Sequence, residues 1–404
     1  MDERTTRTNT GGCVTRTSTI FWTVVTAAAV IAGCSDGGES NTPSADIGPA
    51  LDSAPPPTLG CETSDDCGDG QHCVDTVCLR VPTSTVVVTD NTLDEPADVS
   101  VLNVSCVGGQ VEAPDGPESA TAYGIVDRFG GGRQTIGIEV GFFEQDNWPP
   151  AECVELPVSE QRDCFRSIPS QWAAISTDPA EGNSELPNTC QARLDCPLGY
   201  DCVEGDVGSH CAPQHGLYEI SGVPTNTWLV VRSRNTIPIY EKKWKDTYIF
   251  GVYLYADRLE TDGRYRTNAM MVSDGQWVTV PNTLLVPGIK KQNGALGGRI
   301  RDCRSASRDS FTLGNASIGL KVPGSATGYF NDDEEDTVPL LENTGTDVYG
   351  RFTVVDIAPG PNRVAASILD GDDNVVSLGS EEIVIVPDSL SIVSFPGKQA
   401  ILGK

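Results

Sequence analysis

Short apolar runs with β-branched and aromatic residues recur along the chain from about residue 100 onward. The runs at 228–231 (WLVV), 248–255 (YIFGVYLY) and 383–386 (IVIV) have the length and composition of strands. Turn dipeptides such as Asp370-Gly371 bound these runs. No segment after the N-terminal region shows a sustained helical period with caps. Short strands at this spacing predict an all-β chain built of sandwiches.

Four segments in the first part of this region reappear in the same order further along. The matched pairs are 107–111 with 296–300, 136–140 with 318–322, 216–224 with 350–359, and 280–284 with 386–390. This order predicts a duplication. The first copy carries extra residues, which we name the first insertion (141–215) and the second insertion (234–279).

The segment 350–368 (GRFTVVDIAPGPNRVAASI) reads as Gly, aromatic, apolar, turn and then strand. This pattern resembles the carboxypeptidase regulatory-like fold, a transthyretin-like Greek-key sandwich. The resemblance is good over about 294–397 and weaker over 100–288, where the insertions interrupt it. It implies two tandem Greek-key β-sandwiches, at 81–290 and 291–404, in a family whose modules are usually non-catalytic.

An apolar run at 20–32 follows a basic N-terminal stretch and ends at Ile31-Ala32-Gly33-Cys34. Its 13 residues are fewer than the roughly 20 that a membrane span needs, but they suit a cleavable signal. The ending resembles the bacterial lipobox, which implies a signal peptide at 1–33 and a lipid on Cys34. An ordinary secretory signal with a coincidental Cys is the alternative.

Residues 34–60 contain no aromatic side chain, and they are rich in Gly, Pro, Ser and Asp. Such a composition predicts a disordered linker that holds the folded body off a membrane. Ser35, directly after Cys34, resembles the pattern of outer-membrane lipoproteins. We therefore expect a cell-envelope protein on the outer membrane, either periplasmic or surface-exposed.

The chain has 14 Cys, and twelve remain after Cys13 and Cys34 are set aside. An even number in an exported chain favours disulfides. Two clusters share their spacing and flanking residues, and they predict small modules at 61–80 and 190–211; their members are Cys61, Cys67, Cys73 and Cys78, then Cys190, Cys196, Cys202 and Cys211.

About 20 residues cannot form a core, so two disulfides must hold each module, and three pairings are open in each. Zinc is the less favoured alternative, because zinc sites prefer gaps of two to four residues between paired Cys. Outside the modules, Cys153 and Cys164 are expected to close a local loop. Cys106 and Cys303 are left to pair with each other by elimination.

The formal charge of −28 disfavours nucleic acid as a partner, because phosphate backbones are repelled. Little material for catalysis is present. The three histidines, His72, His210 and His215, lie in or beside the Cys modules, where we expect exposed, structural side chains. An envelope hydrolase with its active site in the two insertions is the alternative function.

Calcium is the one cofactor that the sequence suggests. Asp370, Asp372, Asn374 and Glu381 stand at positions 1, 3, 5 and 12 of a calcium loop. Position 6 is Val375, where such a loop needs Gly, so an ordinary hairpin is favoured over a calcium-dependent adhesin.

The tryptophans of the insertions, Trp148 and Trp244, could mark an exposed binding surface or pack against the sandwich. Together these features predict a surface-anchored lipoprotein that serves as a non-catalytic interaction or scaffold module. The expected partners are a membrane, through the lipid, and an envelope protein or polysaccharide.

Overall fold

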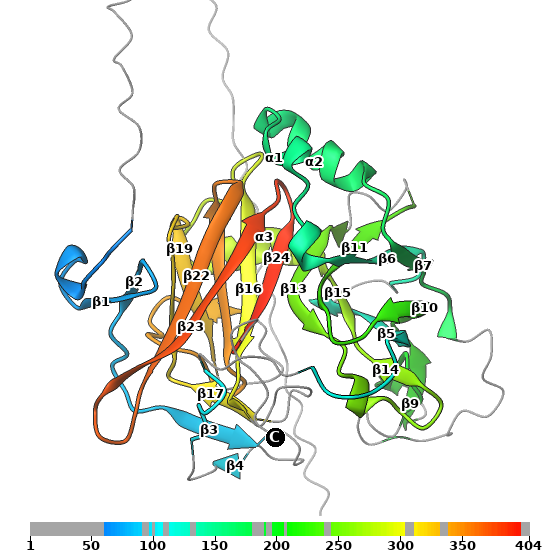
Figure 1. Cartoon of the computed structure of the whole chain (residues 1–404), viewed down its shortest axis with the longest axis horizontal. Coiled ribbons are helices and arrows are strands. Elements are labelled where there is room, and N and C mark those ends of the chain that lie inside the picture. Colours follow the sequence, from blue (N-terminus) through cyan, green and yellow to red (C-terminus); the bar gives the residue numbers. More distant parts are fainter. Residues whose placement is uncertain are drawn as a thin grey trace, which may run out of the picture. The chain divides into compact units, whose positions relative to one another are not determined.

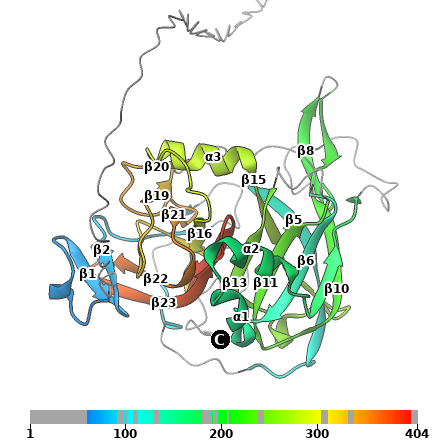
Figure 2. The same ribbon diagram turned by 90° about the horizontal axis from the view of Figure 1, so that it is seen from above.

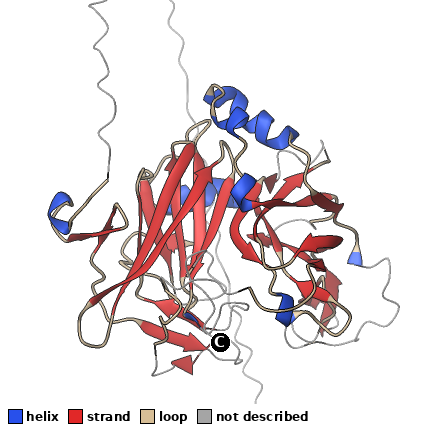
Figure 3. Cartoon of the chain, in the orientation of Figure 1, coloured by secondary structure: helices blue, strands red, loops and turns tan. Residues whose placement is uncertain are grey.

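The computed structural model describes the chain over 60–90, 97–98, 102–107, 113–129, 135–179, 190, 196–205, 208–237, 244–303, 311–331 and 338–396. The predicted signal peptide, Cys34 and the linker before residue 60 lie outside these residues. The described residues all belong to one compact unit. They are nearly all β (Figures 1 and 3), which confirms the predicted fold class.

The C-terminal sandwich packs two sheets against each other. One has the strand order β20-β19-β21-β16-β24, and the other has the order β18-β22-β23. In β22, Val364, Ala366 and Ile368 alternate into the core between the sheets. The strands are β16 (Gly294–Ile300), β18 (Ser317–Leu320), β19 (Ala326–Phe330), β20 (Pro339–Leu340), β21 (Arg351–Ile357), β22 (Gly360–Leu369), β23 (Val375–Ile385) and β24 (Leu390–Phe395).

The N-terminal sandwich has the same design. A sheet with the order β10-β5-β15-β12, in which β14 also pairs with β5, faces the strands β7-β6-β11-β13. The strands are β5 (Ser119–Phe129), β6 (Ile138–Glu144), β7 (Trp172–Ile175), β10 (Gly216–Pro224), β11 (Trp228–Asn235), β12 (Trp244–Lys245), β13 (Thr247–Tyr253), β14 (Arg264–Arg266) and β15 (Ala269–Ser273).

The two sandwiches repeat one strand topology. In each, a first strand pairs antiparallel with one neighbour and parallel with another: β5 with β10 and β15, and β16 with β21 and β24. The three-strand series β6-β11-β13 matches β18-β22-β23 in the same way. The duplication is therefore visible in the fold. The expectation that 234–279 is an insertion is wrong, because this range contains β13 and β15, which match β23 and β24 of the second copy.

Two of the four matched segment pairs fall on equivalent strands, namely β6 with β18 and β10 with β21. The other two do not. The strand equivalent to β16 is β5, which begins after the segment 107–111, and residues 280–284 lie at the end of a helix, whereas 386–390 lead into a strand. Short Gly-rich and Pro-containing motifs match by chance more easily than strand order does.

The two sandwiches are joined by a main-chain ladder. β13 pairs in parallel with β24, with Thr247 opposite Leu390 and Ile249 opposite Ile392. This pairing fuses one sheet of each copy into a nine-stranded sheet, visible where β13 and β24 run side by side in Figure 1. It also removes two exposed sheet edges, which otherwise invite aggregation.

The structure has helices that the sequence pattern did not predict. They are α1 (Ala151–Val154), α2 (Val158–Ser167) and α3 (Asp274–Thr283), with 3-10 turns at Ser64–Asp66, Gln145–Asn147 and Ala256–Arg258. In α2 only Gln161 and Phe165 are buried, too few to show a period. At α3, Ser273 caps the helix by accepting from the N–H of Gln276.

Helix α3 contacts β15 and β20 (Figure 2). Among the described residues, no helix is long and apolar enough to cross a membrane. Strand β3 (Val87–Asp90) lies in the range expected for the first sandwich, yet it pairs with β17 (Phe311–Gly314) and with β4 (Ala97–Asp98). Val88 is accordingly buried in the core of the second sandwich.

Candidate functional site

Both Cys modules have the same disulfide pattern, first to third and second to fourth Cys. The pairs are Cys61–Cys73, Cys67–Cys78, Cys190–Cys202 and Cys196–Cys211. Each module is a two-stranded hairpin, β1 (Gln71–Val74) with β2 (Val77–Arg80), and β8 (Tyr200–Gly205) with β9 (Gly208–Pro213). Every cysteine of the two groups close enough to hold a metal is already bonded in one of these disulfides.

A glycine shared by the two modules explains part of their common sequence. Gly70 and Gly199 have φ angles of 72° and 89°, a region that favours glycine. Their carbonyls accept hydrogen bonds from the N–H groups of Val81 and Gln214, at 2.9 Å in both cases. The two modules are thus one local fold used twice.

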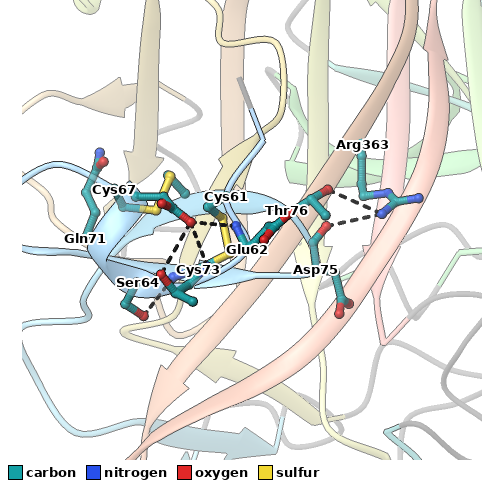
Figure 4. The surroundings of a disulfide bond; sticks show 12 residues. Cys61, Glu62, Ser64, Cys67, Gln71, Cys73, Asp75, Thr76 and Arg363 are labelled. Atoms are coloured by element: carbon teal, nitrogen blue, oxygen red, sulfur yellow. Dashed lines mark hydrogen bonds between the residues drawn. A yellow bond between two sulfur atoms is a disulfide. The ribbon is translucent and has the colours of Figure 1, made fainter. Parts of the chain in front are cut away.

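The first module lies on the outer face of the sheet β18-β22. Its Val77 and Leu79 pack with Ala365 of β22, and Arg363 Nη1 donates to the carbonyl of Asp75 at 3.2 Å (Figure 4). A Cβ on Gly319 would stand 2.7 Å from the carbonyl oxygen of Cys78, so this close approach requires glycine.

The equivalent outer face of the N-terminal sandwich is covered by the α1–α2 hairpin instead. The disulfide Cys153–Cys164 staples this hairpin. Arg232 of β11 reaches under it and donates to the carbonyls of Phe165 and Ile168 at 2.6 and 2.9 Å. These carbonyls belong to the C-terminal end of α2, where the last carbonyls of a helix have no N–H partner within the helix. Arg232 supplies the missing donors.

The sixth disulfide, Cys106–Cys303, joins the segment before β5 to the segment after β16. The two cysteines are 197 residues apart in the sequence. This bond therefore links the start of the first copy directly to the second copy.

The four residues of the suggested calcium loop do not come together. Asp370 Oδ1 accepts hydrogen bonds from the N–H groups of Asp372 and Asn374, at 2.9 and 2.8 Å, which closes an ordinary hairpin turn. Glu381 is buried in β23 opposite Val364, five residues along the ladder from the base of the turn. At about 3.3 Å per residue this separation is roughly 16 Å.

The tryptophans of the insertions are not on the surface. Trp148 and Trp244 are only 7% and 4% exposed. The ring centroid of Trp148 lies 4.6 Å from that of Phe143, inside the core under α1 and α2. Trp244 lies in the core of the N-terminal sandwich. Of the two interpretations that the sequence left open, packing within the fold is therefore the one that the structure has, and an exposed binding surface at these residues is not present.

His215 is also buried, at 2% exposure, whereas the sequence suggested an exposed side chain. Its Nδ1 lies 3.4 Å from Oδ1 of Asp127 on β5. The neighbouring hydroxyls of Ser176 and Thr135 donate to the backbone carbonyls of Thr135 and Val126. The other two histidines lie on the hairpins of the Cys modules, where His210 is exposed and His72 is half-buried.

A cavity of about 770 Å³ is lined by α2 and by residues of β11, β12, α3 and the turn before β24. Helix α2 contributes Arg162, Asp163, Arg166 and Ser167 from the first insertion. The remaining lining residues are Arg234 of β11, Lys245 of β12, Asp274 of α3 and, from the turn between β23 and β24, Asp388. We name this site the seam cavity.

Ion pairs connect the walls of the seam cavity. Asp388 lies between two cations, with Oδ2 at 3.0 Å from Arg162 Nη1 and Oδ1 at 2.7 Å from Lys245 Nζ. Lys245 Nζ is also 3.7 Å from Asp274 Oδ1. Arg234 Nη2 lies 2.6 Å from Glu139 Oε2, beneath the cavity.

Burial shapes the ionisation of the carboxyl groups around the seam cavity. Desolvation raises the pKa of Asp246, which is 2% exposed, although Arg166 Nε at 3.4 Å acts in the opposite direction. Desolvation likewise raises the pKa of Asp274. Burial would also raise the pKa of Glu139, but the hydrogen bonds and charges of Arg234 and Arg232 outweigh it and lower that pKa.

Sequence reasoning placed binding in the two insertions but did not identify the residues of the seam cavity. One signal was available. Arg162 and Arg166 are four residues apart, which places them on one face of a helix, but no helix was predicted there. No sequence pattern indicated that Arg234 of β11 and Lys245 of β12 line the same cavity.

No protein-family model matches this sequence, and no curated protein sequence matches it. Solved structures that match include the shaft pilin SpaA from Lactobacillus rhamnosus GG, at 10% identity, covering 70% of this chain and 100% of that chain with a TM-score of 0.17. A mutant of the same pilin matches at 9% identity over 69% and 97% of the two chains, with a TM-score of 0.18. TM-scores this low do not establish a shared fold or a shared function.

Proposed function

We propose that this protein is a lipid-anchored, non-catalytic interaction module of the bacterial cell envelope. The observation that carries the proposal is a body held by six disulfides behind a lipobox-like segment ending in Cys34. Disulfides persist in oxidising compartments outside the cytoplasm. The linker 35–60 would separate the body from the membrane that holds the lipid.

The shape of the body supports an interaction role. Two sandwiches joined through β13 and β24 make a platform, and the first insertion is added to it. Residues added to a scaffold are the usual carriers of binding. Helix α2 of the first insertion lines the seam cavity, so a platform and a recognition site are present in one unit.

The alternative, an envelope hydrolase, would need a base beside a nucleophile. The pair of His215 and Asp127 is the place to test. We expect the purified chain to show no turnover across panels of ester, peptide and glycoside substrates. The matched variants are His215→Gln and Asp127→Asn at the pair, and His210→Gln at the exposed histidine.

Thermal melts of the same variants show whether each still folds. Turnover by the wild-type chain that is lost in a folded His215→Gln or Asp127→Asn variant, but kept in His210→Gln, would overturn the non-catalytic role. Absence of turnover in all four proteins supports it.

A further inference from the structure

Half of the seam cavity is built from an element that the sandwich fold does not require. Four of its eight lining residues lie on α2, and the other four are Arg234, Lys245, Asp274 and Asp388. The second copy forms the same strand topology without an equivalent of α2. The residues of α2 are therefore available for recognition.

The local charge of the cavity is opposite to that of the chain. The lining has four cationic side chains and three carboxylates, whereas the whole sequence has 28 Lys and Arg against 56 Asp and Glu. At physiological salt, interactions between exposed charges are screened beyond a Debye length of about 8 Å. The charges of the lining therefore affect a bound ion more than the negative charge of the rest of the chain does. The lining favours a ligand with a negative group.

Two guanidinium groups of the lining have unused donors. Arg162 Nε and Arg234 Nε are buried and have no hydrogen-bond partner within the part of the chain that the structure describes. Buried donors without acceptors are costly. The edge of a guanidinium group formed by Nε and one Nη matches a carboxylate in a bidentate geometry. A small movement of the Arg162 or Arg234 side chain toward an anion would therefore give its Nε an acceptor.

The remaining lining groups indicate that the ligand carries hydroxyl groups as well as a negative charge. The carboxylates of Asp163 and Asp274 and the hydroxyl of Ser167 accept hydrogen bonds, which suits ligand hydroxyl groups. No side chain of the lining is apolar. The volume of about 770 Å³ exceeds what one inorganic ion fills and lies in the range of about 300–1,000 Å³ for organic ligands.

We propose that the seam cavity binds a carboxylate-bearing carbohydrate, with Arg162 and Arg234 holding the carboxylate and the aspartates accepting from sugar hydroxyls. A neutral saccharide lacks the anion for the arginines, and an inorganic anion lacks donors for the aspartates. An acidic peptide offers carboxylates but few hydroxyl donors. The assignment rests on the proposed interaction role and names its ligand class.

The test is isothermal titration calorimetry with the purified full chain in detergent and trigalacturonate as the probe. Its methyl ester is the matched neutral probe, and sulfate and triglutamate are the anionic controls. We expect trigalacturonate to bind and the ester, sulfate and triglutamate to bind at least about tenfold more weakly, because a hydrogen bond to a charged group is lost or mismatched.

Two variants remove one cation each without leaving its carboxylate partner unpaired. Arg162→Gln leaves Asp388 with Lys245. Arg234→Gln leaves Glu139 with Arg232, so both variants are expected to fold. Each should weaken trigalacturonate binding about tenfold or more, while Arg266→Gln on the exposed end of β14 should leave it unchanged.

Three outcomes would overturn the assignment. They are failure of the wild-type chain to bind trigalacturonate, binding of the ester as tightly as trigalacturonate, and cavity variants that bind trigalacturonate as tightly as the wild-type chain does. Tighter binding of sulfate or triglutamate would overturn the carbohydrate as the ligand class. These outcomes are measured on the purified chain, so they can fail while the envelope location and the absence of turnover still hold.

Discussion

Lys245 Nζ lies 2.7 Å from Asp388 Oδ1, and this ion pair connects β12 of the first copy to the turn before β24 in the second copy. Two residues along, the backbone ladder between β13 and β24 begins at Thr247 and Leu390. Side chains and main chain thus join the two sandwiches at the same place. The seam cavity lies at this junction, so its geometry depends on both copies.

Arg232 is the buried side chain on which the α1–α2 hairpin depends. It is 0% exposed and bonds to Glu139 Oε1 at 3.1 Å as well as to the two carbonyls at the end of α2. Arg232→Ala should lower the free energy of unfolding by roughly 3–5 kcal/mol, because buried acceptors lose their donor. Urea unfolding measures the loss.

The exposed Arg266 is the control for that substitution, and Arg266→Ala should change stability by less than about 0.5 kcal/mol. A loss for Arg232→Ala no larger than for Arg266→Ala would show that α2 does not depend on this contact.

Asp356 fastens the segment before β16 to the end of β21. Its Oδ1 accepts from the N–H of Lys290 and from Asn293 Nδ2, both at 2.8 Å, and its Oδ2 accepts from Ser325 Oγ at 2.6 Å. Burial acts to raise the pKa of Asp356, but these hydrogen bonds outweigh it and lower the pKa below its ordinary 3.8. The charged form is therefore the one that stabilises the fold.

Because the folded-state pKa is lowered, this contribution is present above the unfolded pKa and is lost as the pH falls through the folded pKa. Asp356→Asn should cost about 2 kcal/mol at pH 7, and the difference from wild type should shrink below about pH 4. Denaturant unfolding across pH checks it. A difference that persists unchanged at low pH would show that the charge is not responsible.

The disulfide Cys106–Cys303 should contribute more to stability than the local disulfide Cys153–Cys164. The two bonds span sequence separations of 197 and 11 residues. Loop-closure entropy predicts losses of about 5 and about 3 kcal/mol for the paired Cys→Ser variants. Unfolding of each double variant under non-reducing conditions measures this, and an equal or reversed order would contradict it.

Calcium should not stabilise this chain through the turn at Asp370. The carboxylate there already accepts the N–H groups of the hairpin, and Glu381 lies on a distant part of β23. A ligand at about 100 times its Kd would add roughly 2.7 kcal/mol to the free energy of unfolding. A rise of Tm in millimolar calcium that disappears in Asp370→Ala would contradict this expectation.

Local patterns predicted local structure well. The apolar runs at 228–231 and 248–255 identified the strands β11 and β13, and the shared spacing of the Cys clusters identified a repeated module. These features depend on neighbours within a few residues, where the period of a strand and the reach of a disulfide act directly.

Long-range strand pairing was not predictable from one sequence, whereas the long-range disulfide Cys106–Cys303 was predicted by elimination. The parallel pairing of Thr247 with Leu390 joins segments 143 residues apart, and no local pattern specifies such a partner. Helix α2 buries only two side chains, so its period was hidden, and with it the alignment of Arg162 and Arg166. Burial of Trp148 likewise depends on an element that folds over it.

Membrane attachment through Cys34 is what distinguishes an anchored envelope module from a secreted one. Mass spectrometry of the mature protein from membrane fractions, with Cys34→Ser as the comparison, measures it directly. We expect a chain that begins at Cys34 and carries a diacylglyceryl thioether, and a Cys34→Ser variant that is released or left unprocessed. A mature chain with an unmodified Cys34, or a variant that stays processed and membrane-bound, would contradict the proposed function.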